Sequence, residues 1–283
     1  MKIIVTGATG FVGRHVIPEL LCRRHNVIAV ARNLNRAKEM PWYKKVVFFS
    51  CDIHDPMLES VKIFGVPDAI IHLAWSGLPN YEDLFHFEKN FPADYLFLKH
   101  MIVAGTKKVM VTGTCLEYGM QSGPLSEETV TKPSTPYGLA KDTLRRFLQA
   151  FMAKHPFTLQ WVRLFYIYGP GQNPNSLLAQ LDNAIDNGDK VFNMSGGEQL
   201  RDYLPVEEVA RYLASLIEHH ECSDVINCCS GKPISVRRLV EKRIAERGAK
   251  IKLNLGYYPY PDYESMAFWG CRNKLDAIMG KNE

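Results

Sequence analysis

The chain has 283 residues, of which 46% are hydrophobic, and its 34 basic and 30 acidic residues give a formal net charge of +4. These apolar residues can build a large core, while the small charge excludes a general attraction to nucleic acid or to a membrane surface. The seven cysteines form no CxxC pair and no His/Cys spacing suited to a metal, which excludes a disulfide framework and indicates a reducing cytoplasm without a bound metal.

The opening stretch, MKIIVTGATGFVG, predicts a strand and a turn. It is apolar, but Gly7, Gly10 and Gly13 interrupt it and Arg14 follows, unlike the apolar core of a secretory signal. Elsewhere no apolar run reaches the roughly 20 residues that cross a bilayer. We therefore expect a cytoplasmic protein with no membrane partner.

Short β-branched runs alternate with longer helical patterns through the first two thirds of the chain. Strands are predicted near 2–6, 26–31, 46–49, 68–73, 107–112 and 158–165. Helices are predicted at 11–23, 56–64, 81–104 and 136–154, the last one beginning at an N-cap threonine followed by proline. This alternation predicts an α/β fold, a Rossmann-type doubly wound parallel sheet.

A smaller C-terminal region is predicted after 169–171 (GPG), where loop residues replace the regular alternation. We assign 1–168 and roughly 191–222 to the sheet domain, and 169–190 and 223–283 to the smaller region. Helices at 205–220 and 234–247 and a strand at 224–227 are predicted. The segment 256–271 is too rich in proline and aromatics for regular structure.

Glycines 7, 10 and 13 stand between the first predicted strand and the first helix. Backbone N–H groups at such a place can approach a pyrophosphate at the helix N-terminus. A tight turn would also use glycines, but their position at the end of the first strand favours dinucleotide binding. At the end of the second strand, Arg32 stands where an NAD enzyme needs a carboxylate, so we expect NADP(H); a solvated surface arginine is the alternative.

Tyr137 and Lys141 are four residues apart in a predicted helix, so their side chains share one face. A nearby ammonium stabilises a phenolate, which makes proton exchange with a substrate oxygen feasible. Such a pair alone also arises by chance. The pair becomes evidence for a catalytic site because of Thr114, a hydroxyl at the end of the fifth strand. Ligands of open α/β sheets bind at that edge.

In this order, the glycine loop, the strand-end hydroxyl and the YxxxK pair resemble extended short-chain dehydrogenases, specifically the NAD-dependent epimerase/dehydratase family of nucleotide-sugar enzymes. The resemblance covers nearly the whole chain and includes HLAW (72–75), RLFYIYGPGQ (163–172) and RDY (201–203). It implies that Tyr137 is the acid/base, that Lys141 orients the nicotinamide ribose and lowers the tyrosine pKa, and that Thr114 shares the substrate hydrogen bond.

The resemblance also implies the binding residues, with the smaller region binding substrate. Cofactor contacts are expected from Gly7, Thr9, Gly10, Phe11, Val12, Gly13, Arg32, Asp52, Ile53, Leu73, Ala74, Asn90, Thr112, Tyr137 and Lys141. Substrate contacts are expected from Trp75, Glu117, Tyr166, Ser176 and Arg201.

Three of these residues have alternative interpretations. Asp52, where the superfamily contacts adenine, could equally cap a helix. Tyr166 stands where family members carry an asparagine, and it could be a core aromatic instead of a sugar contact. Arg201 is expected on the nucleotide diphosphate, with a surface ion pair as the alternative.

Departures from the family pattern narrow the reaction. Dehydratases of the family need an Asp-Glu pair directly after the catalytic threonine, where this chain has Cys115 and Leu116. Dehydration is therefore excluded, and Cys115 is expected to be a small buried residue, one position away from the cysteine base of some epimerases.

Chain length, the expected NADP(H) preference and the segment 259–270 resemble reductases of nucleotide-linked 4-keto-6-deoxyhexoses. We therefore expect reduction of the C4 ketone of such a sugar, with dTDP as the expected nucleotide, in deoxysugar and surface polysaccharide biosynthesis. An NAD(P)-dependent nucleotide-sugar epimerase is the main alternative, and a non-enzymatic NADP(H)-binding sensor is a further one. A homodimer through helices 81–104 and 136–154 is possible, although their apolar faces could equally serve the core.

Overall fold

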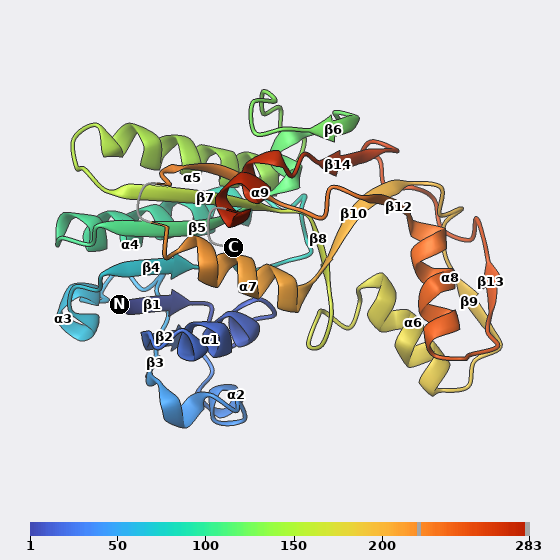
Figure 1. The fold of residues 1–283 in the computed structure, drawn as a ribbon, viewed down its shortest axis with the longest axis horizontal. Helices are drawn as coiled ribbons and strands as arrows, with labels where there is room; N and C mark the ends of the chain where they lie inside the picture. Colours follow the sequence, from blue (N-terminus) through green and yellow to red (C-terminus); the bar gives the residue numbers. More distant parts are fainter. Residues whose placement is uncertain (220–221, 281–283) are drawn as a thin grey trace.

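Seven parallel strands form the central sheet of the computed structural model, which describes residues 1–219 and 222–280 (Figure 1). Their order across the sheet is β3 (Val47–Ser50), β2 (Asn26–Ala31), β1 (Lys2–Thr6), β4 (Ala69–His72), β5 (Lys108–Thr114), β7 (Thr158–Leu164) and β11 (Asp224–Cys228). The order reverses direction between β1 and β4. Ligands of such sheets bind at this switch point, beyond the carboxyl ends of the strands.

Helices cover both faces of this sheet, which confirms the predicted doubly wound architecture. α1 (Gly13–Cys22), α7 (Val206–Leu216) and α9 (Asn273–Met279) pack on one face. α3 (Ser60–Phe64), α4 (Phe91–Val103) and α5 (Pro136–Met152) pack on the other. Because side chains alternate along a strand, Ile3 and Val5 of β1 enter the first core while Ile4 enters the second.

A smaller part of the molecule lies beyond the carboxyl ends of the strands, at the right of Figure 1. Its α6 (Leu177–Asp186) and α8 (Val236–Glu246) pack around a separate core with the paired strands β9 (Val191–Asn193) and β13 (Lys252–Asn254). Two small sheets join it to the main body: β8 (Tyr166–Tyr168) with β10 (Leu200–Pro205) and β12 (Pro233–Ser235), and β6 (Gly123–Leu125) with β14 (Phe268–Gly270).

The structure corrects the predicted division of the chain. β11 belongs to the central sheet and α9 packs against α7 and β11, so 223–283 is not wholly in the smaller part. β9 pairs with β13, so it does not belong to the sheet domain.

Several elements also differ from prediction. Segment 256–271 contains β14, and α2 (Leu34–Lys38), α6 and α9 were not predicted. The predicted helix 205–220 ends as α7 at Leu216, and residue 220 lies outside the described residues.

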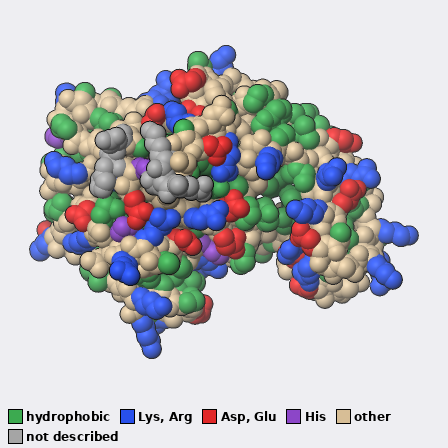
Figure 2. All heavy atoms as spheres, in the orientation of Figure 1, with side chains coloured by type: hydrophobic (Ala, Val, Ile, Leu, Met, Phe, Trp, Pro, Cys, Tyr) green, Lys and Arg blue, Asp and Glu red, His purple; other side chains and the backbone are tan. Residues whose placement is uncertain are grey.

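Basic and acidic side chains are interspersed on the face shown in Figure 2, in keeping with the small net charge. Hydrophobic side chains gather on this face where the main body meets the smaller part. Among the helices of residues 1–219 and 222–280, none is both long and apolar enough to cross a bilayer.

Candidate active site

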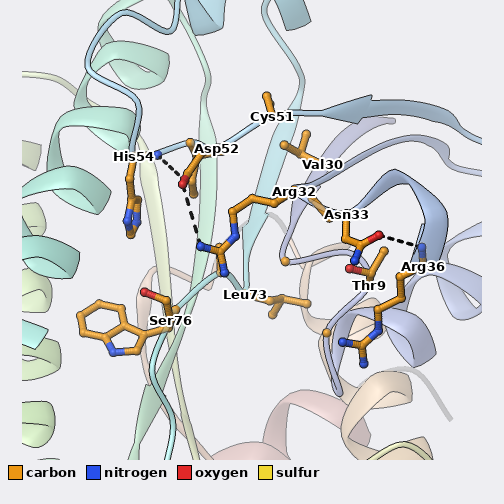
Figure 3. A pocket seen from close by; sticks show the side chains of 16 residues that line it. Thr9, Val30, Arg32, Asn33, Arg36, Cys51, Asp52, His54, Leu73 and Ser76 are labelled. Carbon is orange, nitrogen blue, oxygen red and sulfur yellow. Dashed lines mark hydrogen bonds and ion pairs between the residues drawn. The ribbon is translucent and has the colours of Figure 1, made fainter. Parts of the chain in front are cut away.

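A cavity of about 390 Å³ opens at the switch point of the sheet, beyond the ends of β1, β2, β3 and β4 (Figure 3). Its size and position suit a nucleotide-sized ligand. The lining residues are Gly7, Thr9, Gly10, Val30, Ala31, Arg32, Asn33, Arg36, Cys51, Asp52, Ile53, His54, Leu73, Ala74, Trp75 and Ser76.

The glycine loop closes this cavity on one side and leaves no room for side chains. Gly7 adopts a positive φ of 67°, and a Cβ there would lie 2.8 Å from the Ala74 nitrogen in the loop after β4. A Cβ on Gly13 would lie 2.3 Å from the Gly7 carbonyl oxygen. The first N–H groups of α1, around Phe11 and Val12, have no partners within the helix. The loop therefore fits a pyrophosphate group at the start of α1.

Two arginines line the cavity at the end of β2, where the ribose of a dinucleotide is expected (Figure 3). Arg32 is 67% exposed, and its guanidinium lies 3.9 Å from the Asp52 carboxylate. Arg36 comes from α2, whose first turn is capped by the Asn33 side chain. Sequence reasoning missed Arg36, because the short helix that carries it was not predicted.

Asp52 does not cap a helix, the alternative to an adenine contact, because the next helix, α3, begins only at Ser60. It lines the cavity, and its Oδ1 also accepts the His54 N–H at 3.0 Å in the turn after β3. Asn90 does not line the cavity: its buried amide accepts the Ser76 hydroxyl at 2.8 Å and donates to the Ser76 carbonyl at 2.9 Å. Asn90 is therefore placed to act through Ser76, where direct cofactor contact was expected.

Trp75 connects the cavity with the Tyr137 and Lys141 side chains. The Lys141 Nζ lies 3.9 Å from the centre of a Trp75 ring and donates to the Thr112 carbonyl at 2.9 Å. Lys141 is buried, and burial lowers its pKa to about 8, although Asp94 and Glu117 favour the charged form. Its ammonium is thus held at the end of β5, beside the cavity.

Tyr137 lies in a cluster of rings formed by Trp75, Tyr81 and His86. Its side chain hydrogen-bonds Thr114. Burial raises the Tyr137 pKa far above its ordinary value, which differs from the expected lowering by Lys141. The Lys141 ammonium is hydrogen-bonded to the Thr112 carbonyl.

Glu117 does not contact substrate as expected. It is fully buried, and its carboxylate accepts hydrogen bonds from the Thr114 N–H at 2.9 Å, the Trp161 indole at 2.9 Å and the Arg163 guanidinium at 2.7 Å. These bonds hold the end of β5 in place behind the site. Cys115 is buried as predicted, and burial raises its thiol pKa, so it is not a base.

Arg201 does not present a free guanidinium fork to a diphosphate, as had been expected. It is 2% exposed, and it donates to Glu264 at 3.0 Å, to the Tyr166 hydroxyl at 3.2 Å and to two backbone carbonyls. Tyr166 in turn donates a hydrogen bond to Glu264. Ser176, the remaining predicted substrate contact, begins α6 and donates to the Asn173 carbonyl at 2.7 Å.

Sequence reasoning missed three residues of this region. Tyr81 and His86 were predicted within a helix from 81 to 104. Tyr81 lies in a loop, whereas His86 lies in a π-helical turn, η2 (His86–Asn90), that leads directly into α4 at Phe91. The loop brings the Tyr81 carbonyl to the Tyr137 N–H at 3.1 Å. Glu264 lies in the segment expected to be irregular. The prolines and aromatics there carried no signal for a buried carboxylate.

Within residues 1–219 and 222–280, no group of three or more His, Cys, Asp and Glu side chains is arranged to hold a metal ion.

Comparison with known proteins places this geometry among nucleotide-sugar enzymes. Residues 3–229 match the NAD dependent epimerase/dehydratase family. The chain is 35% identical, over 96% of its own length and 100% of the relative's, to a dTDP-6-deoxy-L-talose 4-dehydrogenase (NAD(+)) of Aggregatibacter actinomycetemcomitans. It is 25% identical to a dTDP-4-dehydro-6-deoxyglucose reductase of Escherichia coli, over 85% of this chain and 80% of the relative.

A solved structure supports the same assignment. MoeE5 in complex with UDP-glucuronic acid and NAD is 26% identical and has a TM-score of 0.85, with 99% of this chain and 93% of the other covered.

Proposed function

Because the chain belongs to the NAD dependent epimerase/dehydratase family, we propose that it uses NADPH to reduce the C4 ketone of a nucleotide-linked 4-keto-6-deoxyhexose. It is an NAD(P)-dependent nucleotide-sugar enzyme of the short-chain dehydrogenase type. The observation that carries the reductase proposal is the Tyr137 phenol, which is buried among Trp75, Tyr81 and His86; burial raises its pKa and so favours the proton-donating form. Both positions that hold carboxylates in the dehydratases are filled by buried side chains, Cys115 and Leu116.

Each site residue is proposed to have a separate role in the reduction of the ketone. Reduced nicotinamide supplies a hydride to a carbonyl carbon. Tyr137 donates its proton to the carbonyl oxygen as that oxygen becomes an alkoxide, and Thr114 holds the same oxygen by a hydrogen bond. Lys141, hydrogen-bonded to the Thr112 carbonyl and lying over Trp75, is proposed to orient the nicotinamide ribose, as the family resemblance implies. One hydride and one proton thus convert the ketone into a secondary alcohol.

The preference for NADPH rests on the end of β2. A 2′-phosphate carries about two negative charges, which suit a pair of guanidinium groups. Arg32 and Arg36 both line the cavity there, and Asp52 is the only carboxylate among the lining residues described. The 35% identical relative is named as an NAD(+) enzyme, and the proposal of NADPH for this chain rests on Arg32 and Arg36.

The substrate class rests on the relatives. Two of them act on dTDP-linked 6-deoxyhexoses according to their names, and both names place the chemistry at C4. A dTDP-4-keto-6-deoxyhexose is therefore the proposed substrate, in a pathway that makes a deoxysugar for a surface polysaccharide. The chain would accept a sugar that another enzyme has already dehydrated.

The proposal is tested by supplying NADPH with dTDP-4-keto-6-deoxyglucose, its C3/C5-epimerised form, or dTDP-glucose, in separate reactions. We expect one NADPH oxidised per keto sugar consumed, and no reaction with dTDP-glucose. Interconversion of unreduced nucleotide sugars without net oxidation of NADPH would establish the epimerase alternative. Firm cofactor binding with no turnover of any keto sugar would support the sensor alternative.

A further inference from the structure

A charged network lies behind the cofactor cavity. His54, in the turn after β3, lines the cavity, and its Nε2 lies 2.8 Å from Oδ1 of Asp94 (Figure 3 shows His54). Asp94 lies in the first turn of α4 and is completely buried. A second histidine, His72 at the end of β4, places its Nε2 3.2 Å from the same carboxylate oxygen.

The His72 ring also contacts Thr6. The Thr6 hydroxyl oxygen accepts the Leu73 and Ala74 N–H groups at 3.2 Å each, and it lies 3.0 Å from His72 Nδ1. His72 is therefore held in the core between Thr6 and Asp94, whereas His54 reaches the cavity wall.

Of the two histidines beside Asp94, His54 has the shorter contact, at 2.8 Å, and it lines the cavity. Burial disfavours the Asp94 carboxylate, but the two histidines outweigh it and lower the Asp94 pKa. Burial likewise opposes protonation of His54, but its hydrogen bond and attraction to Asp94 outweigh it and raise the His54 pKa. Asp52 adds to this rise and Arg32 opposes it. Lys141, also buried, interacts with Asp94 electrostatically.

We propose that His54 is a cofactor-binding residue, an imidazolium held in its charged form by Asp94 and directed into the cavity that takes the dinucleotide. The anionic pyrophosphate and adenosine portion of the ligand would gain a third cation besides Arg32 and Arg36. This inference rests on the dinucleotide binding in the proposed function. It follows from two features of this chain: the buried Asp94 lies 2.8 Å from the His54 ring, and His54 lies on the cavity wall.

The proposal predicts that dinucleotide affinity depends on pH through His54. A histidine whose folded pKa is raised stays charged up to that pKa and loses its charge above it, so affinity falls as pH rises through this value. NADH is the best probe because it lacks the 2′-phosphate. That phosphate titrates at about pH 6, so it would add its own pH dependence to the binding. We expect the affinity of the wild-type chain to fall about tenfold across the transition, the size of one charge-assisted contact.

Variants separate this role from a structural one. His54→Gln should weaken NADH at pH 6 by about tenfold and remove the pH dependence. Asp94→Asn should leave the shape of the plot of NADH affinity against pH unchanged. It should shift the transition in that plot to lower pH, because it removes the negative charge that stabilises the His54 imidazolium. His25→Gln is the matched control: His25 also pairs with a carboxylate, Glu218 at 2.9 Å, but it precedes β2 at the opposite end of the strand and should leave the profile unchanged.

The measurements are NADH dissociation constants by calorimetry between pH 5.5 and 9, with the His54 pKa read from histidine NMR signals of the intact chain. A His54→Gln profile that matches the wild type would overturn the inference while leaving the proposed function intact. If the wild type bound neither NADH nor NADPH at any pH, both the proposed function and the inference would be wrong. If Asp94→Asn fails to fold, His54→Gln and the NMR titration still test whether a charged His54 binds the cofactor.

Discussion

At the scale of single residues, we propose that Arg32 decides between the two cofactors. Arg32→Ala should weaken NADPH binding by about 1–2 kcal/mol, because it removes a charge-assisted bond to the 2′-phosphate at a largely exposed site. NADH binding should barely change, since that ligand has nothing at this position for the guanidinium to bind.

Dissociation constants for both cofactors check this prediction, with Arg238→Ala as the control. Arg238 is an exposed arginine of α8, in the smaller part of the molecule. Equal losses for NADH and NADPH on Arg32→Ala would show that the arginine contributes only general charge, and NADPH would no longer be favoured by the structure.

Tyr137 is the residue that we propose as the proton donor. Tyr137→Phe removes the donated proton and keeps the ring packed against Trp75, Tyr81 and His86. We expect kcat to fall by about 10²–10⁴-fold with cofactor affinity nearly unchanged. Tyr81→Phe is the matched control, because its backbone carbonyl, and not its hydroxyl, holds Tyr137.

Steady-state kinetics and cofactor titration measure the two effects separately. Near-normal turnover of Tyr137→Phe would place the proton donor elsewhere and remove the basis of the proposed mechanism. A fall in both kcat and cofactor affinity would instead indicate that the phenol holds the cofactor as well.

Local patterns could predict the central site residues, but contacts between distant residues could not. The glycine loop, Thr114, Tyr137 and Lys141 each follow from a position at a strand end or on one helix face. Glu264 meets Arg201 from 63 positions further along the chain, and nothing near either residue encodes the pairing. Glu117 was misassigned because its position in the chain does not reveal that its side chain turns into the core.

At the scale of elements, long periodic segments were predicted well and short ones were not. All strands of the central sheet were expected close to their observed positions, because buried parallel strands are continuous apolar runs. β9, β12, β13 and β14 have three residues each and exist only through pairing with distant partners. Such short strands leave no periodic pattern to detect.

The segment before α4 shows how one misplaced boundary affects the site. The pattern of hydrophobic and polar residues from 81 onward fits a helix. The chain instead forms a loop, which is followed by the π-helical turn η2 and then by α4. Ring contacts with Trp75 and Tyr137 draw His86 into the active site. Tertiary packing thus outweighed local helix propensity at this position.

At the scale of the whole molecule, we propose that two copies of this chain pair through α4 and α5. These helices contact one another on the outside of the sheet and expose Leu96 by 48%, Val103 by 56% and Phe147 by 49%. An exposed apolar face of this kind indicates an interface. Phe147→Glu should therefore convert a dimer into a monomer, because the new charge would be buried on association.

Light scattering during size-exclusion chromatography gives the mass in solution. Leu255→Glu, at a partly exposed leucine after β13, is the control and should leave the dimer intact. A wild-type chain that elutes as a monomer at all concentrations tested would rule out this interface.

The central claim, hydride transfer to C4 of a keto sugar, is tested most directly by an isotope label. The chain is given dTDP-linked 4-keto-6-deoxyhexose and NADPH stereospecifically deuterated at the transferable position of its nicotinamide. The account predicts one deuterium on C4 of a 6-deoxyhexose product, located by NMR and counted by mass spectrometry, with loss of the NADPH absorbance at equal stoichiometry. Consumption of the keto sugar with no deuterium at C4, or with the label at another carbon, would contradict it.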